Sequence, residues 1–182
     1  MTQAHRIGDW MQTYGGRQFW PLDPRPEEIH ISDIAAALSK LCRYGGHCLR
    51  FYSVAEHCVH VAAAARPSLA LTALLHDASE AYLSDVIRPI KSRLTNYMEI
   101  EAELERAIAR RFGTICPMPA EVKHLDNGIL WAEMQQNMAT PPQPWAKWLT
   151  DEPLDVNLQF WTPERAGAEF MAAFRLYGGA DV

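Results

Sequence analysis

Helix start and stop signals recur along this chain, whereas convincing strand patterns are almost absent from it. Residues 95–112 carry acidic side chains early and basic ones late and end at Gly113, an order that complements the helix dipole. Ser53 and Glu56 match a capping box. In this motif the serine hydroxyl accepts a hydrogen bond from the backbone amide of the glutamate, and the glutamate side chain accepts one from the backbone amide of the serine. Thr162, followed by a proline and a glutamate, is another strong helix start. The pattern predicts an all-α fold of about six helices.

The remaining segments are assigned from apolar spacing and from glycine and proline. The first thirty residues predict turns or a short hairpin lying on the domain. Residues 84–91 predict a loop, and the proline- and tryptophan-rich stretch 140–155 is the least regular part. The other helices are expected from Ser32 to the Gly45-Gly46 pair, from Ser53 to Pro67, from a cap at Ser68 through His76, Asp77 and Glu80, from Ala120 to about Met138, and from Thr162 to Gly178.

Length and composition favour one domain. The chain has 182 residues, of which 48% are hydrophobic, and such a chain can bury a core of its own. No internal repeat divides it, so we expect a single domain over residues 1–182. Within it we expect an irregular N-terminal segment (1–30), a helical core (31–138), and a proline- and tryptophan-rich loop followed by a C-terminal helix (139–182).

Charge and apolar runs argue against several classes of partner. With a net charge of -5, broad electrostatic binding to a nucleic acid or an anionic membrane is not expected. No run approaches the ~18 apolar residues that span a bilayer, and the N-terminus lacks the layout of a secretion signal. These features predict a cytoplasmic protein. Its cysteines form no CxxC pair and are expected to be reduced thiols, namely Cys42, Cys48, Cys58 and Cys116.

Two histidines and two aspartates on three predicted helices form the most informative polar set. His57 follows the capping box, the doublet His76-Asp77 follows two leucines, and Asp126 lies in an otherwise apolar helical turn. Buried carboxylates are costly without compensation, and one metal ion compensates two at once. The mixed nitrogen and oxygen set suits one divalent transition metal, namely Mn, Co, Fe, Ni or Zn. The same spacing also fits a His–Asp hydrogen-bond network that ties helices together.

The runs Val54-Ala55-Glu56-His57 and Leu75-His76-Asp77-Ala78-Ser79-Glu80, followed by Asp126, resemble the HD-domain metal-dependent phosphohydrolases. The chain is similar to the bacterial 5'-deoxynucleotidases and to small phage enzymes that include a deoxyadenosine triphosphate triphosphohydrolase. The resemblance covers residues 31–138 and implies a single compact HD-domain helical bundle. It implies that Glu80 lies next to the reacting water, and that the metal ligands are His57, His76, Asp77 and Asp126.

The same resemblance implies four substrate contacts. Arg43 takes the place of a phosphate-contacting arginine, and Tyr44 stands where the nucleotidases carry a tryptophan that packs on the base or sugar. Asp85 is expected near the sugar hydroxyl and Lys91 at the rim. A shorter interval between the two ligand histidines is a second departure from the nucleotidases. Each contact also has a plainer interpretation, with Arg43 as a cation at a helix C-terminus, Asp85 as a turn residue and Lys91 as a solvated side chain.

The expected activity is removal of the 5'-phosphate of deoxynucleoside monophosphates by metal-activated water, with Glu80 as base or proton donor. The alternative in chemistry is release of triphosphate from a deoxynucleoside triphosphate. An alternative of another class is a nucleotide-binding regulator without turnover. We expect a small deoxynucleotide as the partner, no stable nucleic-acid partner and no membrane, and, from the resemblance alone, a homo-oligomer. Further candidates are His47 and Arg50 for phosphate contact, and Trp20, Trp145 and Trp148 for stacking on a base.

Overall fold

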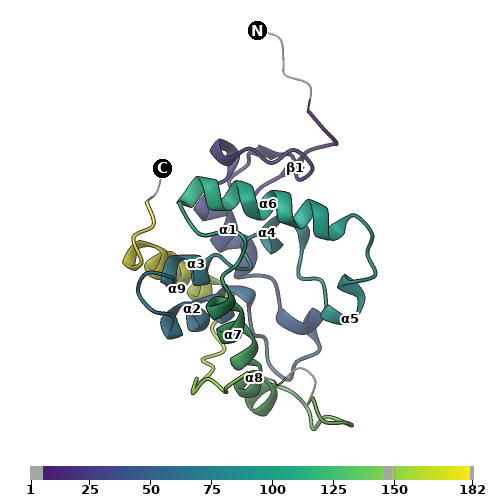
Figure 1. Cartoon of the computed structure of the whole chain (residues 1–182), viewed down its shortest axis with the longest axis vertical. Helices are drawn as coiled ribbons and strands as arrows, with labels where there is room; N and C mark the ends of the chain where they lie inside the picture. Colours follow the sequence, from purple (N-terminus) through teal and green to yellow (C-terminus); the bar gives the residue numbers. More distant parts are fainter. Residues whose placement is uncertain (1–5, 146–148, 150, 181–182) are drawn as a thin grey trace.

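Helices make up most of the structure, as the start and stop signals predict. The computed structural model describes residues 6–145, 149 and 151–180, and Figure 1 shows the N-terminal hairpin beside α6. The α-helices of this part are α1 (Ile31–Leu38), α2 (Val54–Ala64), α3 (Ala70–Leu74), α4 (Glu80–Leu83), α5 (Arg88–Lys91), α6 (Tyr97–Phe112), α7 (Ala120–Gly128), α8 (Leu130–Asn137) and α9 (Pro163–Leu176). The shorter elements are the 3₁₀ helices η1 (Pro26–Glu28) and η2 (Arg43–Gly46) and the strands β1 (Met11–Gln12) and β2 (Gln18–Phe19).

Helix α2 lies in the apolar core. Its residues Val54, Cys58 and Val61 are fully buried, and the helix packs against α3 and α9. The Ser53 hydroxyl accepts the Glu56 amide at 3.1 Å, which confirms the predicted N-cap. The helix that carries the first predicted ligand is therefore fixed both by its cap and by its packing.

The N-terminal segment forms the short hairpin that the sequence predicts. β1 and β2 pair antiparallel, with Met11 opposite Phe19. Phe19 is fully buried and stacks on Tyr82, with ring centroids 4.1 Å apart. The Asp33 carboxylate accepts the Gly15 amide at 2.6 Å. These contacts tie the hairpin to α1 and α4.

Helix α1 is shorter than predicted. It starts one residue before the predicted cap Ser32 and ends well before Gly45. The helix stops early because residues 41–43 run extended and pair with residues 52–54 through backbone hydrogen bonds and an antiparallel bridge. This pairing places Arg43 on η2 and not at the end of a helix.

The helix predicted from Ser68 through Glu80 is interrupted. α3 and α4 are separated by a turn over residues 75–79, and Leu69, not Ser68, is the N-cap residue of α3. Several backbone amides in this turn donate to carbonyls three residues earlier, a tighter pattern than the α-helix. The prediction that His76 and Glu80 share one face of a helix is therefore wrong.

The helix predicted from Ala120 to Met138 also divides, at Ile129, into α7 and α8. Ile129 is fully buried, so its apolar character gives no sign of the break. Gly128 lies against a neighbouring loop, because a Cβ atom added to it would lie 2.5 Å from the Glu152 carbonyl oxygen. The loop therefore approaches the chain at the point where the two helices meet.

Helix α6 ends where the sequence predicts, whereas α5 was not predicted. α6 ends at Gly113, which has a left-handed φ of 68°, and this confirms the predicted stop. α5 lies inside the predicted loop 84–91. The expected number of about six helices is thus too low for the described residues, because α5 was missed and two predicted helices are each divided in two.

Residues 139–161, where the structure describes them, form neither helix nor strand and are tied to the core by a buried carboxylate. The Glu56 side chain accepts the backbone amides of Gln159, Phe160 and Trp161 at 2.6, 2.8 and 2.7 Å. The predicted reach of Glu56 back to its own helix cap is therefore wrong, since three amides satisfy a buried charge better than one. Trp148, a predicted stacking residue, lies outside the described residues.

Two observations bear on the surroundings of the protein. In the part of the chain that the structure describes, no helix combines the length and the apolar character needed to cross a membrane. All four cysteines are free, and the sulfur atoms of Cys42 and Cys48 lie 3.5 Å apart.

Candidate metal centre

Four predicted ligands from separate parts of the chain meet at one place. His57 comes from α2, His76 and Asp77 come from the turn after α3, and Asp126 comes from α7. His57 Nε2 lies 3.2 Å from Asp126 Oδ1 and 3.7 Å from Asp77 Oδ2. His76 Nε2 lies 3.1 Å from Asp77 Oδ2 and 3.8 Å from Asp126 Oδ1. The buried group His57, His76 and Asp126, with its ligand atoms within 4.8 Å of one another, could hold a metal ion.

Both imidazole rings are oriented through their Nδ1 atoms. His57 Nδ1 lies 2.7 Å from Glu133 Oε1, and His76 Nδ1 lies 2.7 Å from the Ala73 carbonyl oxygen. A carbonyl oxygen only accepts hydrogen bonds, so His76 Nδ1 carries the proton, and Nε2 of the neutral ring presents a lone pair. The Nε2 atoms of His57 and His76 are buried and have no hydrogen-bond partner among residues 6–145, 149 and 151–180. Anchored Nδ1 and free Nε2 atoms are the arrangement of histidines that bind a metal.

The site requires positive charge. A neutral His76 would direct its Nε2 lone pair at the carboxylate oxygen of Asp77, which is unfavourable unless a proton or a metal cation intervenes. Burial alone lowers the pKa of His76, but Asp77 and Asp126 raise it well above its usual value. Burial raises the pKa of Asp126, yet the nearby imidazoles of His57 and His76 bring it well below its usual value. The chemistry of this donor set therefore fits a divalent cation.

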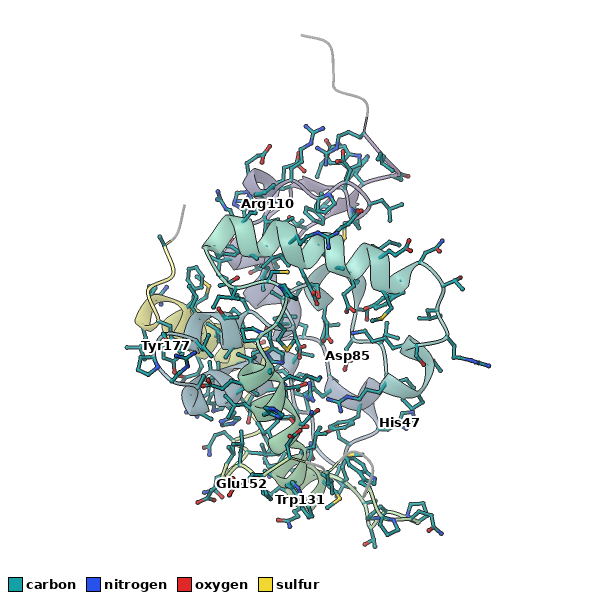
Figure 2. The ribbon with its side chains drawn as sticks, in the orientation of Figure 1. His47, Asp85, Arg110, Trp131, Glu152 and Tyr177 are labelled. Atoms are coloured by element: carbon teal, nitrogen blue, oxygen red, sulfur yellow. The ribbon has the colours of Figure 1, made fainter. Side chains whose placement is uncertain are left out.

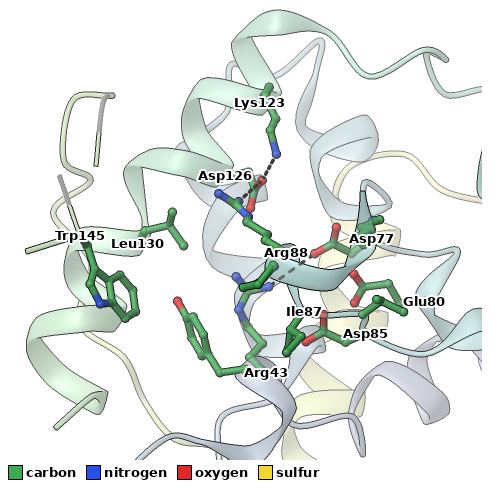
Figure 3. Close-up of a pocket in the computed structure, with 14 residues that line it drawn as sticks. Arg43, Asp77, Glu80, Asp85, Ile87, Arg88, Lys123, Asp126, Leu130 and Trp145 are labelled. Atoms are coloured by element: carbon green, nitrogen blue, oxygen red, sulfur yellow. Dashed lines mark hydrogen bonds and ion pairs between the residues drawn. The ribbon is translucent and has the colours of Figure 1, made fainter. Parts of the chain in front are cut away.

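Asp126 is held from its other side by two cations that sequence reasoning missed. Lys123 Nζ lies 2.7 Å and Arg88 Nη2 lies 3.3 Å from Asp126 Oδ2, and Figure 3 shows both side chains reaching this carboxylate. One oxygen of Asp126 thus faces the histidines, and the other faces the two cations. Lys123, three residues before Asp126 on α7, was open to detection from helical spacing. Arg88 lies in a predicted loop, so no helical spacing could have revealed it.

A pocket of about 270 Å³ is lined by two of the predicted ligands, Asp77 and Asp126. In Figure 3 the carboxylates of Asp77, Glu80 and Asp85 lie to one side of Arg43, and Trp145 with Leu130 lies to the other. The pocket therefore has an acidic wall and an apolar wall, the mixture that small-molecule sites show. All four predicted substrate contacts line it, namely Arg43, Tyr44, Asp85 and Lys91.

Glu80 lies in the acidic wall, although it begins α4 and does not belong to the helix of His76. Its side chain is buried, and its Oε2 atom has no hydrogen-bond partner in the described part of the chain. Burial, then Asp77 and Asp85, raise the pKa of Glu80 well above its usual value. The group therefore keeps a proton to a higher pH than an ordinary glutamate does, as a proton carrier requires.

Arg43 and Tyr44 enter the pocket from η2. Arg43 is buried, and its Nη1 atom lies 3.6 Å from Asp77 Oδ2. Tyr44 has a left-handed φ of 58°, and its ring lies 6.0 Å from that of Trp145. The plainer interpretation of Arg43, a solvated cation at a helix end, is therefore wrong. Asp85 is partly buried, and the desolvation raises its pKa.

The other predicted contacts differ in their surroundings. Lys91 lines the pocket, but its Nζ atom also pairs with Glu101 Oε1 at 2.7 Å. His47 and Arg50 are both exposed, and neither is among the lining residues of the pocket. The Arg50 guanidinium lies over the Phe160 ring, 3.7 Å from its centroid. In Figure 2 His47 and Asp85 lie on the opposite side of α7 from Tyr177, which directly follows α9.

Glu133 on α8 is a third residue at this centre that sequence reasoning passed over. It is fully buried, and in addition to His57 it contacts Arg43, whose Nε atom lies 3.2 Å from Oε1. Burial raises the pKa of Glu133, but Arg43 and His57 lower it to about 2. The available signal was its position seven residues after Asp126, two helical turns later on the same face of a predicted helix.

The fold and the site together define a predominantly helical protein with a buried histidine–aspartate group suited to a metal ion. No protein-family model matches the chain. The chain is 36% identical over 124 residues to the uncharacterized protein YfdR of Escherichia coli (strain K12), an alignment that covers 68% of this chain and 70% of that protein. The chain belongs to the same family as YfdR.

A second relative comes from another bacterium. The chain is 39% identical over 124 residues to the uncharacterized protein RCAP_rcc00048 of Rhodobacter capsulatus. This alignment covers 63% of each protein, less than two thirds of the length of the relative. Neither name states a function.

Proposed function

We propose that the protein is an HD-type phosphohydrolase that uses one divalent metal ion to remove the 5'-phosphate from deoxynucleoside monophosphates. The observation that carries the proposal is the pair of buried, unpartnered imidazole nitrogens that face two carboxylates. The same pocket holds a buried guanidinium, Arg43, and an acid with a raised pKa, Glu80. This combination supplies a cation site, a phosphate contact and a proton carrier within one small volume.

Each residue has a role that follows from its surroundings. His57, His76, Asp77 and Asp126 would hold the ion, which acts when bound as a Lewis acid on a phosphoryl oxygen and lowers the pKa of water. Arg43 is buried, so its charge is weakly screened, and its planar fork suits two oxygens of a phosphate. Glu80 carries the proton that the departing 5'-oxygen needs.

The opposite wall suits the remainder of a nucleoside. Trp145 and Leu130 provide an apolar surface on which a base can stack, and Tyr44 lies next to Trp145. Asp85 offers a carboxylate to a sugar hydroxyl at the acidic wall. This division of the pocket supports a nucleotide over a simple phosphate ester as the substrate.

The test is a hydrolysis panel of deoxynucleoside monophosphates and triphosphates, with added manganese or cobalt. Wild-type protein should release inorganic phosphate from monophosphates, while Glu80→Gln should lose turnover and keep its bound metal. Asp126→Asn should lose both. Glu121→Gln, at an exposed acid of α7, is the matched control and should behave as wild type. Metal-loaded wild-type protein that hydrolyses no nucleotide would refute the proposal.

A second candidate is release of triphosphate from a deoxynucleoside triphosphate. The observation that favours it is the presence of Arg88 and Lys123 in the pocket lining, in addition to Arg43 and Lys91. The charge of a single phosphate does not need four cations, whereas the larger negative charge of a triphosphate can pair with several of them. Arg88→Met and Lys123→Met should then raise the KM for triphosphates more than the KM for monophosphates. Equal effects on both substrates would favour the monophosphatase.

The proposal includes the HD-type arrangement of the helices. It also includes a homo-oligomer, and light scattering would test this oligomeric state. The alternative of another class, a regulator without turnover, predicts that calorimetry detects nucleotide binding while the hydrolysis panel stays silent. The presence of Glu80 in the pocket supports an enzyme over a regulator, since binding alone does not need a buried proton carrier.

A further inference from the structure

Glu133 joins two groups of residues that have different roles in the proposed function. Its Oε1 atom lies 2.7 Å from His57 Nδ1 and 3.2 Å from Arg43 Nε. Its Oε2 atom accepts from Arg43 Nη2 at 3.3 Å and from the Tyr44 hydroxyl. One fully buried carboxylate therefore contacts a predicted metal ligand and both predicted substrate contacts of η2.

These contacts leave Glu133 little freedom to move independently. The Nε2 atom of the ring that Glu133 holds faces Asp126, so a rotation of the carboxylate would turn the ligand nitrogen. Arg43 also lies 3.6 Å from Asp77, which places its guanidinium between Glu133 and the acidic wall. Tyr44 adopts a left-handed backbone conformation, which is costly for a residue with a side chain. Its hydrogen bond to Glu133 offsets that cost.

The next turn of α8 holds the other end of the same segment. Asn137 is fully buried; its side chain accepts the Arg50 amide at 2.8 Å and donates to the Arg50 carbonyl at 3.0 Å. Its backbone carbonyl accepts the Leu49 amide at 2.8 Å. Segment 43–50 is thus held at both ends from one face of α8, but only the Glu133 end also contacts a metal ligand.

We infer that Glu133 is a positioning residue that couples metal binding to substrate binding. The inference rests on the proposed function. A metal that fixes the His57 ring also fixes the carboxylate that holds Arg43 and Tyr44, so an occupied centre presents a formed phosphate contact. By linkage, a bound phosphate ester that orders Arg43 strengthens metal binding in return.

The first test is the affinity for Mn²⁺, measured by calorimetry without nucleotide. Glu133→Gln keeps an oxygen for His57 Nδ1–H but loses the charge and presents an NH₂ group to Arg43. We expect Mn²⁺ binding to weaken by about tenfold or more, the usual effect of losing a carboxylate behind a ligand histidine. At saturating Mn²⁺ we expect the KM for a deoxynucleoside monophosphate to rise more than kcat falls, because Glu133 acts through residues that bind.

Asn137→Ala is the comparison variant, since it releases segment 43–50 without touching a ligand histidine. It should raise KM and leave Mn²⁺ affinity within about threefold of wild type. Glu121→Gln should change neither quantity. If Asn137→Ala weakens Mn²⁺ binding as much as Glu133→Gln does, general loosening explains the effect and the inference is wrong.

Glu133→Asp is a second variant in case Glu133→Gln does not fold, as judged by circular dichroism. This variant keeps the negative charge but places the carboxylate one methylene group farther from His57 and Arg43. We expect it to weaken Mn²⁺ binding as Glu133→Gln does. Folded variants that bind Mn²⁺ as wild type does would overturn the inference. Because Mn²⁺ affinity is measured without substrate, a protein that binds the ion but hydrolyses no nucleotide would refute the proposed function and leave the metal half of this inference testable.

Discussion

Replacement of Glu56 by glutamine tests how strongly one buried carboxylate holds the C-terminal part of the chain. Glu56 Oε1 accepts the amides of Gln159 and Phe160, and Oε2 accepts the amide of Trp161. Burial raises the pKa of Glu56, but His60 and these three amides lower it below its usual value. The carboxylate is therefore ionised at neutral pH. Because residues 159–161 lead into α9, the loss of this contact affects a helix that packs on α1 and α2.

The cost follows from what glutamine can still accept. Its single carbonyl oxygen can keep the two amides at Oε1, but these bonds change from charge-assisted to neutral, a loss of about 0.5–1 kcal/mol each. Its NH₂ group then faces the Trp161 amide, and one buried unsatisfied donor costs about 1–3 kcal/mol. The sum is about 3 kcal/mol, a large share of the roughly 5–15 kcal/mol that stabilises a typical domain.

The assay is urea unfolding at neutral pH, followed by circular dichroism, with a thermal melt alongside. Glu56→Gln should lower the free energy of unfolding by about 3 kcal/mol and the melting temperature by about 6–12 °C. Glu103→Gln, at an exposed position in the middle of α6, should change the free energy by less than about 0.5 kcal/mol. A loss below about 1 kcal/mol in Glu56→Gln would mean that water replaces the carboxylate, and the reasoning would be refuted.

Three further predictions concern stability. Burial and the nearby Arg17 lower the pKa of His30 below 6.5, so on acidification the unfolded chain protonates His30 before the folded chain does. The free energy of unfolding of the wild type should therefore fall more steeply from pH 7 to pH 5 than that of His30→Asn, and parallel slopes in urea unfolding would contradict this. Gly128→Ala places a Cβ atom 2.5 Å from the Glu152 carbonyl oxygen and should cost about 1–3 kcal/mol, whereas an unchanged thermal melt would show that the loop moves freely. Thr162→Ala removes the N-cap of α9 and should cost about 0.5–2 kcal/mol in the same melt, unless another acceptor replaces the hydroxyl.

The helix ends that sequence reasoning predicted correctly depend on neighbouring residues alone. The Ser53 hydroxyl caps the amide of Glu56 three residues later, and Thr162 caps α9 in the same way. Gly113 ends α6 because glycine adopts the left-handed conformation at low cost. Such contacts span a single turn, so the local sequence contains all the information that determines them.

Three of the features that it missed depend on residues far apart in the chain. The Glu56 carboxylate binds amides more than one hundred residues away, and a local capping pattern carries no trace of them. The break at Ile129 falls in an apolar run that continues the helical spacing, and a close approach of the loop at Glu152 marks the place. Glu133 had a detectable position but no recognisable partner, since Arg43 lies ninety residues earlier.

The errors in the predicted helices bear directly on the site. In a continuous α-helix, adjacent side chains point about 100° apart, so His76 and Asp77 would diverge. The turn over residues 75–79 breaks the helix and brings His76 Nε2 to 3.1 Å from Asp77 Oδ2. Pairing of residues 41–43 with 52–54 likewise removes Arg43 from a helix end and places it in the pocket lining. Departures from regular helix are thus what bring these side chains together, which is why a sequence read for regular helices identifies the residues without their geometry.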